Sequence, residues 1–245
     1  MPEQPRVALV TGGARRLGAA IARRLHGAGF AVVVHCRDSR GDADALAAEL
    51  EAARPGSALV LQADLAQFDR LPELVAHTIG RFGRLDALVN NAATFFPTPF
   101  GTVTPAQWDE LLAVNLRAPF FLSQAAAPHL KAARGAILNI SDVYTRQPRT
   151  DLAAYATGKG ALEAMTRALA AALAPEVRVN AIAPGAILWP EDDADPALQE
   201  KILAHTALAR TGSVDEIAAT ALWLLQDATY TTGSVVAVDG GRTPL

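Results

Sequence analysis

The chain has 245 residues, 51% of them hydrophobic, which is enough for one α/β domain with a large core. Its net charge of −3, without a run of lysines, argues against nucleic acid and anionic membranes as partners. The single cysteine, Cys36, excludes a disulfide within the chain and fits a reducing compartment. Only four consecutive apolar residues precede Thr11, too few for a signal peptide, and no stretch approaches a membrane span, so we expect a soluble cytoplasmic protein.

The first predicted elements are a strand, a glycine-rich turn and a helix. Residues 6–11 form a short apolar run, residues 12–18 hold the turn, and the apolar spacing from Leu17 onward is helical. A second apolar run at residues 30–35 lies at the distance that a βαβ unit requires. This order directs backbone N–H groups and the positive end of a helix at a phosphate, so we expect a pyrophosphate site there.

Five further apolar runs alternate with helical patterns, at residues 58–62, 87–90, 136–140, 177–181 and 235–238. Seven strands that alternate with helices predict an α/β fold, a doubly wound seven-stranded parallel sheet with helices on both faces. No repeat or low-complexity linker divides the chain, so residues 1–245 are expected to form a single Rossmann domain. Apolar helices are expected at residues 105–122 and 153–173.

Tyr155 and Lys159 carry the strongest chemical signal in the second half of the chain. They lie four residues apart at the start of a helical pattern, so both polar groups should project from one face of a helix. A positive charge beside a phenol favours the phenolate, so we expect Lys159 to lower the pKa of Tyr155 toward a range useful for general-acid catalysis. A packing pair would have the same spacing, and the motif gains its weight from the rest of the chain.

Several motifs in order resemble those of the short-chain dehydrogenase/reductase family over nearly the whole chain. They are the turn from Thr11-Gly12 to Gly18, Asp64-Leu65, Asn90-Asn91-Ala92, Asn115, Tyr155 with Lys159, Pro184-Gly185 and Asp239-Gly240-Gly241. The resemblance implies a nicotinamide cofactor across the carboxyl ends of the strands. It also implies that Lys159 binds the nicotinamide ribose, that Tyr155 donates the proton and that Asn115 helps to hold a water chain. The residues that it places around the cofactor are Gly12, Arg15, Arg16, Leu17, Gly18, His35, Asp64, Leu65, Asn91, Ala92, Ala93, Tyr155, Lys159, Pro184 and Gly185.

The end of the second strand indicates which nicotinamide is used. An NAD enzyme needs a carboxylate here for the ribose 2′-hydroxyl, but this chain has Cys36 followed by Arg37. An arginine fork binds a 2′-phosphate, and Arg15 and Ser39 add a cation and a hydroxyl. Arg37 could instead be a solvated loop residue, and the adjacent Asp38 weakens the argument, but we expect NADPH over NADH.

Two positions depart from the common family pattern. Arg16 stands where the turn usually has its middle glycine, and Asp142 replaces the serine thirteen residues before Tyr155. Ser141 is one place off, so on a strand it should point to the other side. A carboxylate gives little help to a ketone, whose oxygen becomes negative as hydride arrives. A nitrogen heterocycle must be protonated at a ring nitrogen, and a carboxyl group can supply that proton.

With the stretch from Asn90 to Pro99, these departures resemble the pteridine reductases and dihydromonapterin reductases within the family. The resemblance implies that Phe95 stacks on a pterin whose other face lies on the nicotinamide, and that Arg16 faces the cofactor phosphates and the pterin oxygen. The sequence alone leaves open whether Phe95 or Phe96 faces the site, and either could pack in the core. Ala93 and Ile187 stand where some pteridine reductases have serines. The expected substrate contacts are Arg16, Phe95, Asp142, Tyr155, Leu188 and Trp189.

Residues 186–206 lie where the family has its substrate lid, and they mix apolar residues with acids and prolines. Trp189 either closes over the substrate or contacts another subunit. The helices at residues 105–122 and 153–173 occupy the positions that pair subunits in the family, which implies a homotetramer. The histidines His35, His77, His129 and His205 lack ligand spacing, so we predict no metal site.

The expected activity is reduction of a dihydropterin such as dihydrobiopterin or dihydromonapterin by NADPH, with dihydrofolate and oxidised pterin as further candidate substrates. The catalytic residues would be Asp142, Tyr155, Lys159 and Asn115. One alternative is a broad NADPH-dependent carbonyl or 3-oxoacyl reductase, which would share every cofactor motif and differ at Arg16, Phe95 and Asp142. A second alternative is a non-catalytic NADP(H)-binding regulator, against which the intact Asn115, Tyr155 and Lys159 argue.

Overall fold

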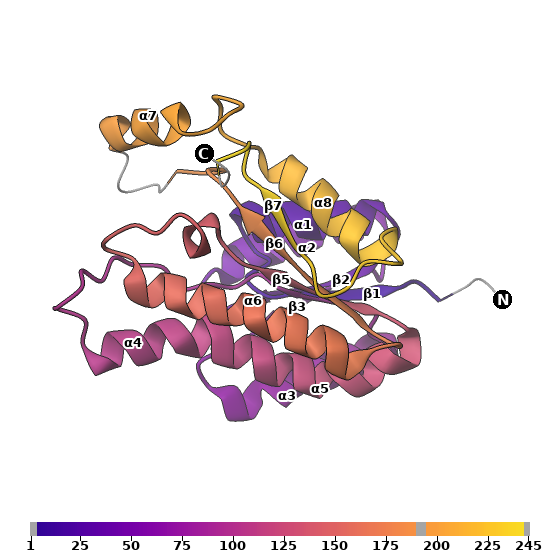
Figure 1. Cartoon of the computed structure of the whole chain (residues 1–245). Helices are drawn as coiled ribbons and strands as arrows, with labels where there is room; N and C mark the ends of the chain where they lie inside the picture. Colours follow the sequence, from indigo (N-terminus) through magenta and orange to yellow (C-terminus); the bar gives the residue numbers. More distant parts are fainter. Residues whose placement is uncertain (1–3, 190–194, 243–245) are drawn as a thin grey trace.

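A single parallel sheet organises the computed structural model, which describes residues 4–189 and 195–242 (Figure 1). The strands lie in the order β3-β2-β1-β4-β5-β6-β7. Their bounds are β1 Val7–Val10, β2 Ala31–Cys36, β3 Ala58–Gln62, β4 Ala87–Asn90, β5 Ala136–Ile140, β6 Arg178–Pro184 and β7 Val235–Val238. The doubly wound parallel sheet predicted from the sequence is confirmed.

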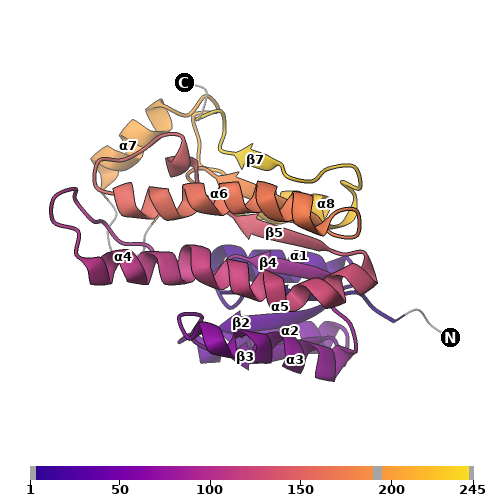
Figure 2. The ribbon, with the colours of Figure 1, turned by 60° about the horizontal axis from the view of Figure 1, so that its bottom comes forward.

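Helices cover both faces of the sheet (Figures 1 and 2). One layer holds α1 (Arg16–Gly27), α2 (Arg40–Ala53) and α8 (Val214–Gln226). The other layer holds α3 (Leu71–Phe82), α4 (Pro105–Leu112), α5 (Ala118–Ala133) and α6 (Ala153–Leu173). The remaining helix, α7 (Pro196–Ala204), lies outside both layers, and short 3-10 turns span Phe68–Arg70 (η1) and Val143–Thr145 (η3).

Burial on both faces explains why the central strands are continuously apolar rather than alternating. In β1, Ala8 and Val10 pack in the core beneath α1 and α8, whereas Val7 and Leu9 pack in the core on the opposite face. All four residues of β1 are fully buried. Parallel sheets covered by helices on both sides require such sequences.

The expected helix at residues 105–122 is not continuous. α4 ends at Leu112, a π-helical turn follows at Ala113–Arg117 (η2), and α5 begins at Ala118. Pro119 explains the interruption, because it has no N–H to donate to the carbonyl of Asn115 four residues earlier and its ring crowds that carbonyl. The wider turn places Asn115, which is buried, on the side of the helix that faces the β4 loop.

The sixth strand is longer than expected, because it runs to Pro184 rather than to residue 181. Its last four residues pair with β7, from Ala181 opposite Val235 to Pro184 opposite Val238. That pairing joins segments more than fifty residues apart in sequence, so local pattern could not reveal it.

The strand order reverses between β1 and β4, and this reversal determines where a ligand can bind. β1 pairs with β2 on one side and with β4 on the other, with Val10 opposite Val34 and Val89. Connections from β1 and β4 leave in opposite directions and open a crevice beyond the carboxyl ends of the strands. The turns after β1, β2, β4, β5 and β6 all meet at this edge.

Candidate active site

Two glycines shape the turn after β1. Gly12 has a φ of +59°, and a Cβ there would lie 3.0 Å from the Cα of Ala92. A Cβ on Gly18 would lie 2.1 Å from the Gly12 carbonyl oxygen. The first turn of α1 contains no acidic residue, and Arg15 at the N-cap makes no side-chain capping bond. The turn therefore forms a cradle that larger residues would fill, at the positive end of a helix, which suits a pyrophosphate.

Arg16 occupies a left-handed backbone position that glycine would fill without strain. Its φ is +51°, a conformation that costs a non-glycine residue roughly 1–2 kcal/mol. Its guanidinium donates to the carbonyl oxygens of Trp189 at 3.2 Å and Leu188 at 3.5 Å. The structure thus brings Arg16 to the backbone of the expected lid. Leu17, the next residue, packs against the core below the turn.

His35 was expected beside the cofactor, but its ring serves the protein backbone. Nδ1 accepts from the Gly12 N–H at 3.2 Å, and Nε2 lies 3.1 Å from the Ala63 carbonyl oxygen. Since that carbonyl only accepts, the ring is neutral with its proton on Nε2. Burial lowers the pKa of His35 to about 4, which keeps the ring neutral. His35 therefore supports the glycine turn from below rather than offering a free nitrogen to a ligand.

Thr11 and Asn91 join the turns after β1 and β4, and we call this pair of residues the seam. The Thr11 hydroxyl accepts from the N–H groups of Asn91 at 2.9 Å and Ala92 at 3.1 Å. The Asn91 side chain donates to the carbonyl oxygens of Thr11 at 2.9 Å and Gly12 at 3.0 Å. The seam fixes Asn91 and Ala92, two of the expected cofactor contacts, next to the glycine turn, and Ala93 is exposed.

Cations gather at the exposed end of β2, each beside a carboxylate. Arg37 donates to Asp38 at 2.6 Å, and Arg15 lies 3.7 Å from Asp42. Ser39 occupies the N-cap of α2 without using its side chain as a cap. Exposed ion pairs are worth at most about 1 kcal/mol, so a doubly charged phosphate can compete for these arginines. The Arg37–Asp38 pair shows how Asp38 is accommodated beside the expected phosphate site.

The turn after β3 carries Asp64 and Leu65, two further residues expected around the cofactor. Asp64 accepts from the N–H of Ala66 at 2.9 Å through its side chain, and Leu65 is buried in the core. Gln62, at the end of β3, donates to the Arg37 carbonyl oxygen at 2.8 Å. The β2 and β3 turns are thereby held side by side.

Asp142, Tyr155 and Lys159 come together where β5 ends and α6 begins. The Tyr155 hydroxyl donates to Asp142 Oδ2 at 2.9 Å, and the Tyr144 N–H donates to Asp142 Oδ1 at 2.9 Å. Lys159 Nζ donates to the Ile140 carbonyl oxygen at 2.8 Å and lies 5.9 Å from the centre of the Tyr155 ring. All three functional groups are buried, with Lys159 only 2% exposed. The Ser141 hydroxyl donates to Glu163, farther along α6.

The expected lowering of the Tyr155 pKa is wrong for this arrangement. Burial and the neighbouring Asp142 carboxylate raise the pKa of Tyr155 well above its ordinary value. Burial also raises the pKa of Asp142 and lowers that of Lys159 to about 8. The Lys159 ammonium by itself would favour the phenolate. Desolvation, however, disfavours the charged forms of Tyr155, Asp142 and Lys159, and the negative charge of Asp142 directly opposes a phenolate at Tyr155. The site therefore holds a proton on Tyr155, and Asp142 takes up a proton more readily than an exposed carboxylate would.

Phe95 is the more exposed of the two phenylalanines beside this group. Its ring meets the Tyr155 ring edge to face, with centroids 4.9 Å apart and an interplanar angle of 87°, and the residue remains 46% exposed. Phe96 is half-buried and packs against the small cluster of Leu111, Leu152 and Tyr155. The backbone of Thr94, next to Phe95, is bonded at both its N–H and its carbonyl oxygen to the Asn115 side chain. In this structure Asn115 thus anchors the loop that presents Phe95.

The loop after β6 begins the expected lid. Pro184 ends β6, and the Gly185 N–H donates to the Val238 carbonyl oxygen at 3.0 Å. Leu188 is 45% exposed and Trp189 is half-buried. Residues 190–194 of the expected lid lie outside the described residues.

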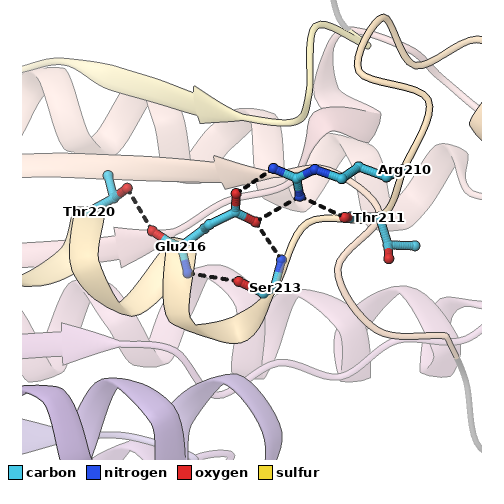
Figure 3. Close-up of polar contacts among 5 residues, drawn as sticks. All are labelled: Arg210, Thr211, Ser213, Glu216 and Thr220. Atoms are coloured by element: carbon cyan, nitrogen blue, oxygen red, sulfur yellow. Dashed lines mark hydrogen bonds and ion pairs between the residues drawn. The ribbon is translucent and has the colours of Figure 1, made fainter.

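The start of the lid is bonded to the segment that follows its end. The Gly212 N–H donates to the Ala186 carbonyl oxygen at 2.9 Å. Beyond it, Glu216 accepts from Arg210 at 2.7 Å and from the Ser213 N–H at 2.7 Å, and the Ser213 side chain caps α8 (Figure 3). The hydrogen bond from the Arg210 guanidinium, and after it the one from the Ser213 N–H, lowers the pKa of Glu216 to about 2. The lid therefore rises from a base that is fixed by a capping box and an ion pair.

Neither a metal cluster nor a membrane span is found in residues 4–189 and 195–242. No three histidine, cysteine, aspartate or glutamate side chains in these ranges group as a metal ion would need. None of their helices combines the length and apolar character that crossing a bilayer demands.

Comparison with known proteins identifies the family. A family model described as enoyl-(acyl carrier protein) reductase matches residues 12–243. The chain belongs to the short-chain dehydrogenase/reductase family. Its glycine turn, seam and Tyr155–Lys159 pair are thus parts of an oxidoreductase that binds a nicotinamide cofactor, and the cradle at Gly12 and Gly18 fits such a cofactor.

Relatives within the family have diverse names. A protein from Streptomyces violaceoruber named for ketoacyl reduction in the granaticin polyketide synthase is 38% identical over 98% of this chain and 96% of its own length. Pteridine reductase 1 of Leishmania tarentolae is 36% identical over 96% of this chain and 95% of its own. A blue fluorescent protein from a metagenomic library, solved in complex with NADPH, is 36% identical, with a TM-score of 0.91 and 97% of both chains covered.

Some residues that shape the site of this short-chain dehydrogenase/reductase were missed by sequence reasoning. Thr94 and Glu163 received no role, although each makes two hydrogen bonds beside the site. For Glu163 a signal was present, because it lies four residues after Lys159 and so on the same helix face. For Thr94 there was none, because its contacts use only the backbone.

Proposed function

We propose that the protein is an NADPH-dependent pteridine reductase. The observation that carries the proposal is the 2.9 Å hydrogen bond from the Tyr155 hydroxyl to the Asp142 carboxylate. A buried carboxylate is poorly suited to a carbonyl substrate, whose oxygen becomes negative during reduction. It suits a carbon–nitrogen double bond, whose nitrogen must take up a proton.

The proton path follows from the charges in the site. Burial raises the pKa of Asp142, so this carboxyl group takes up a proton more readily than an exposed one, and together with the bonded Tyr155 hydroxyl it would supply a proton to a ring nitrogen. The carboxylate that remains accepts from the Tyr155 hydroxyl and the Tyr144 N–H, and the Lys159 ammonium nearby favours it electrostatically. Bound NADPH supplies the hydride, so the carbon–nitrogen bond gains one hydride at carbon and one proton at nitrogen.

Phe95 supports a flat, aromatic substrate. Nearly half of its ring surface is exposed beside Tyr155, and Asn115 anchors its loop through Thr94. A planar heterocycle stacked on this ring would have its edge near Asp142. Leu188 and Trp189 at the start of the lid, with Arg16 beside them, would close over it.

The preference for NADPH rests on the end of β2. Cys36 supplies no carboxylate for a ribose hydroxyl, whereas the exposed Arg37 and Arg15 and the half-buried Ser39 would hold a 2′-phosphate. The NADPH-bound structure of a relative with 36% identity is consistent with this preference. Lys159 would hold the nicotinamide ribose, and the turn at Gly12 and Gly18 the pyrophosphate.

A broad carbonyl or 3-oxoacyl reductase is the second candidate. The relative named for ketoacyl reduction matches 98% of this chain, and Tyr155 and Lys159 are present as that chemistry also requires. The two candidates differ at Asp142, Phe95 and Arg16.

The test is NADPH oxidation by the purified protein with dihydrobiopterin, a β-ketoacyl thioester and a quinone. We expect turnover with the pterin, and we expect Asp142→Ser to abolish it while leaving NADPH affinity within about threefold of wild type. Turnover of the carbonyl substrates alone would reject pterin reduction and favour the second candidate. Gain of carbonyl reduction by Asp142→Ser would assign the choice of substrate to this carboxylate.

We also propose that the protein is a homotetramer. Leu112, Phe120 and Met165 line an apolar groove between α4, α5 and α6, and the Phe120 ring is 41% exposed. Burying such a face against a second copy would stabilise an oligomer. Light scattering coupled to gel filtration measures the mass, and a monomeric mass would reject the proposal.

A further inference from the structure

Three residues of α6 contact the segment that carries Asp142. Tyr155, Lys159 and Glu163 follow one another at intervals of four, so they lie on one face of the helix. Tyr155 bonds the Asp142 side chain, and Lys159 bonds the Ile140 carbonyl oxygen at the end of β5. The third residue, Glu163, is not used by the reaction proposed above.

Glu163 reaches both sides of Asp142. Its Oε1 accepts from the Ser141 hydroxyl at 2.9 Å and from the Thr145 hydroxyl at 2.9 Å. The Thr145 hydroxyl also lies 3.0 Å from the Asp142 carbonyl oxygen, so its one hydrogen faces both acceptors. Glu163 is only 7% exposed, which means that water competes little for these bonds.

The segment needs such an anchor because β5 ends at Ile140 and the backbone bond to β6 at Ser141 does not reach Asp142. The Ser141 N–H still bonds the Ile182 carbonyl oxygen, but Asp142 then leaves β5 and starts the short turn η3. A one-turn 3-10 helix has few hydrogen bonds of its own. A shift of about 1 Å in a catalytic group lowers a rate by roughly a hundredfold, so the position of this turn matters for Asp142.

We propose that Glu163 is a positioning residue that clamps the Ser141–Thr145 segment against α6 and thereby holds Asp142 at the Tyr155 hydroxyl. The clamp requires an oxygen that accepts both hydroxyl groups, not a negative charge. Glutamine retains such an oxygen. It follows that Glu163→Gln should preserve the clamp and that Glu163→Leu, of similar volume, should remove it. The kinetic part of the test rests on the proposed function, because it needs a substrate.

The first measurement compares kcat and KM of these two variants in NADPH oxidation with dihydrobiopterin. We expect Glu163→Leu to lower kcat at least tenfold, with NADPH affinity within about threefold of wild type. Glu163→Gln should keep kcat within about threefold. The double variant Ser141→Ala, Thr145→Val removes the two donors and should lower kcat as much as Glu163→Leu. Adding Glu163→Leu to it should cause little further loss, because both changes break the same clamp.

A second measurement needs no substrate and separates this inference from the proposed function. The NMR signal of isotope-labelled Tyr155, assigned by its loss in Tyr155→Phe, reports the hydrogen bond to Asp142 in the free protein. We expect Glu163→Leu, or the Ser141→Ala, Thr145→Val variant should the former not fold, to shift this signal, and Glu163→Gln to leave it unchanged. A shift in a protein that reduces no pterin would reject the proposed function and keep the clamp. Wild-type kcat and an unshifted Tyr155 signal in the variants without the clamp would overturn the inference.

Discussion

Replacing Tyr155 with phenylalanine removes one oxygen atom from the centre of the site. That oxygen lies 2.9 Å from Asp142 Oδ2, and its loss takes one of two hydrogen-bond donors, the Tyr155 hydroxyl and the Tyr144 N–H, from this buried carboxylate. Loss of a partner for a buried charged group costs about 1–3 kcal/mol. Because Tyr155 is one of the groups that lower the pKa of Asp142, the substitution raises that pKa. The stability lost relative to wild type should therefore shrink as the pH falls and Asp142 takes up a proton.

The catalytic loss should be much larger than the loss of stability. General-acid groups contribute about 10²–10⁴-fold, or about 2.7–5.4 kcal/mol of barrier. We expect Tyr155→Phe to lower kcat by this factor in NADPH oxidation, with NADPH affinity measured by fluorescence titration unchanged. A stability loss of about 1 kcal/mol would lower Tm by about 2–4 °C.

Tyr230→Phe is the matched control, because Tyr230 is fully exposed and precedes β7, whereas Asp142 follows β5 at the carboxyl edge of the parallel sheet. It should leave kcat and Tm unaltered. If Tyr155→Phe kept kcat within about tenfold of wild type, then Tyr155 would not lie on the proton path, and the mechanism built on Asp142 and Tyr155 would have to be abandoned.

Three further predictions concern the cofactor, the buried lysine and the glycine turn. Arg37→Ser should weaken NADPH binding about tenfold or more and leave NADH binding unaltered, as measured by fluorescence titration; equal effects on both cofactors would remove Arg37 from the phosphate site. Burial lowers the pKa of Lys159 from 10.5 to about 8. Between these two pH values Lys159 is protonated in the unfolded chain but not in the native protein. The free energy of unfolding should rise with pH across this window by up to about 3 kcal/mol, a rise that Lys159→Met should lack in urea titrations. Arg16→Gly should raise stability by roughly 1 kcal/mol, because it relieves a positive φ, yet raise the substrate KM through the lost lid contacts; an unchanged KM would argue against Arg16 near the substrate.

Most of the fold was accessible from sequence because a parallel sheet buried on both faces has a local signature. The β5 run at residues 136–140 is buried over its full length and was predicted with the observed bounds. The errors arose where long-range pairing or backbone chemistry decided the outcome. β6 continues to Pro184 because β7 pairs with it, and the helix after Pro105 opens at Asn115 because Pro119 has no N–H.

The site was harder to predict from the sequence, because its residues could be named but the hydrogen bonds and burial that relate them could not. Asp142 was singled out for its chemistry, yet its bond to Tyr155 and the degree of burial around both could not be seen in a motif. Burial and the Asp142 carboxylate together raise the pKa of Tyr155, the opposite of the direction expected from Lys159. Which phenylalanine faces the site depended on the β4 loop, whose shape follows from two backbone bonds at Thr94.

The seam has a consequence for how the free protein moves. Thr11 and Asn91 join the turns that follow β1 and β4 through polar bonds, one residue beyond Val10 and two beyond Val89, the last residues that pair these strands. The Ala92 amide hydrogen, bound to the Thr11 hydroxyl, can exchange with solvent only when that bond opens. Its exchange rate therefore measures how often the two turns separate while the strands stay paired. A dinucleotide that binds across both turns would slow this exchange as its affinity increases.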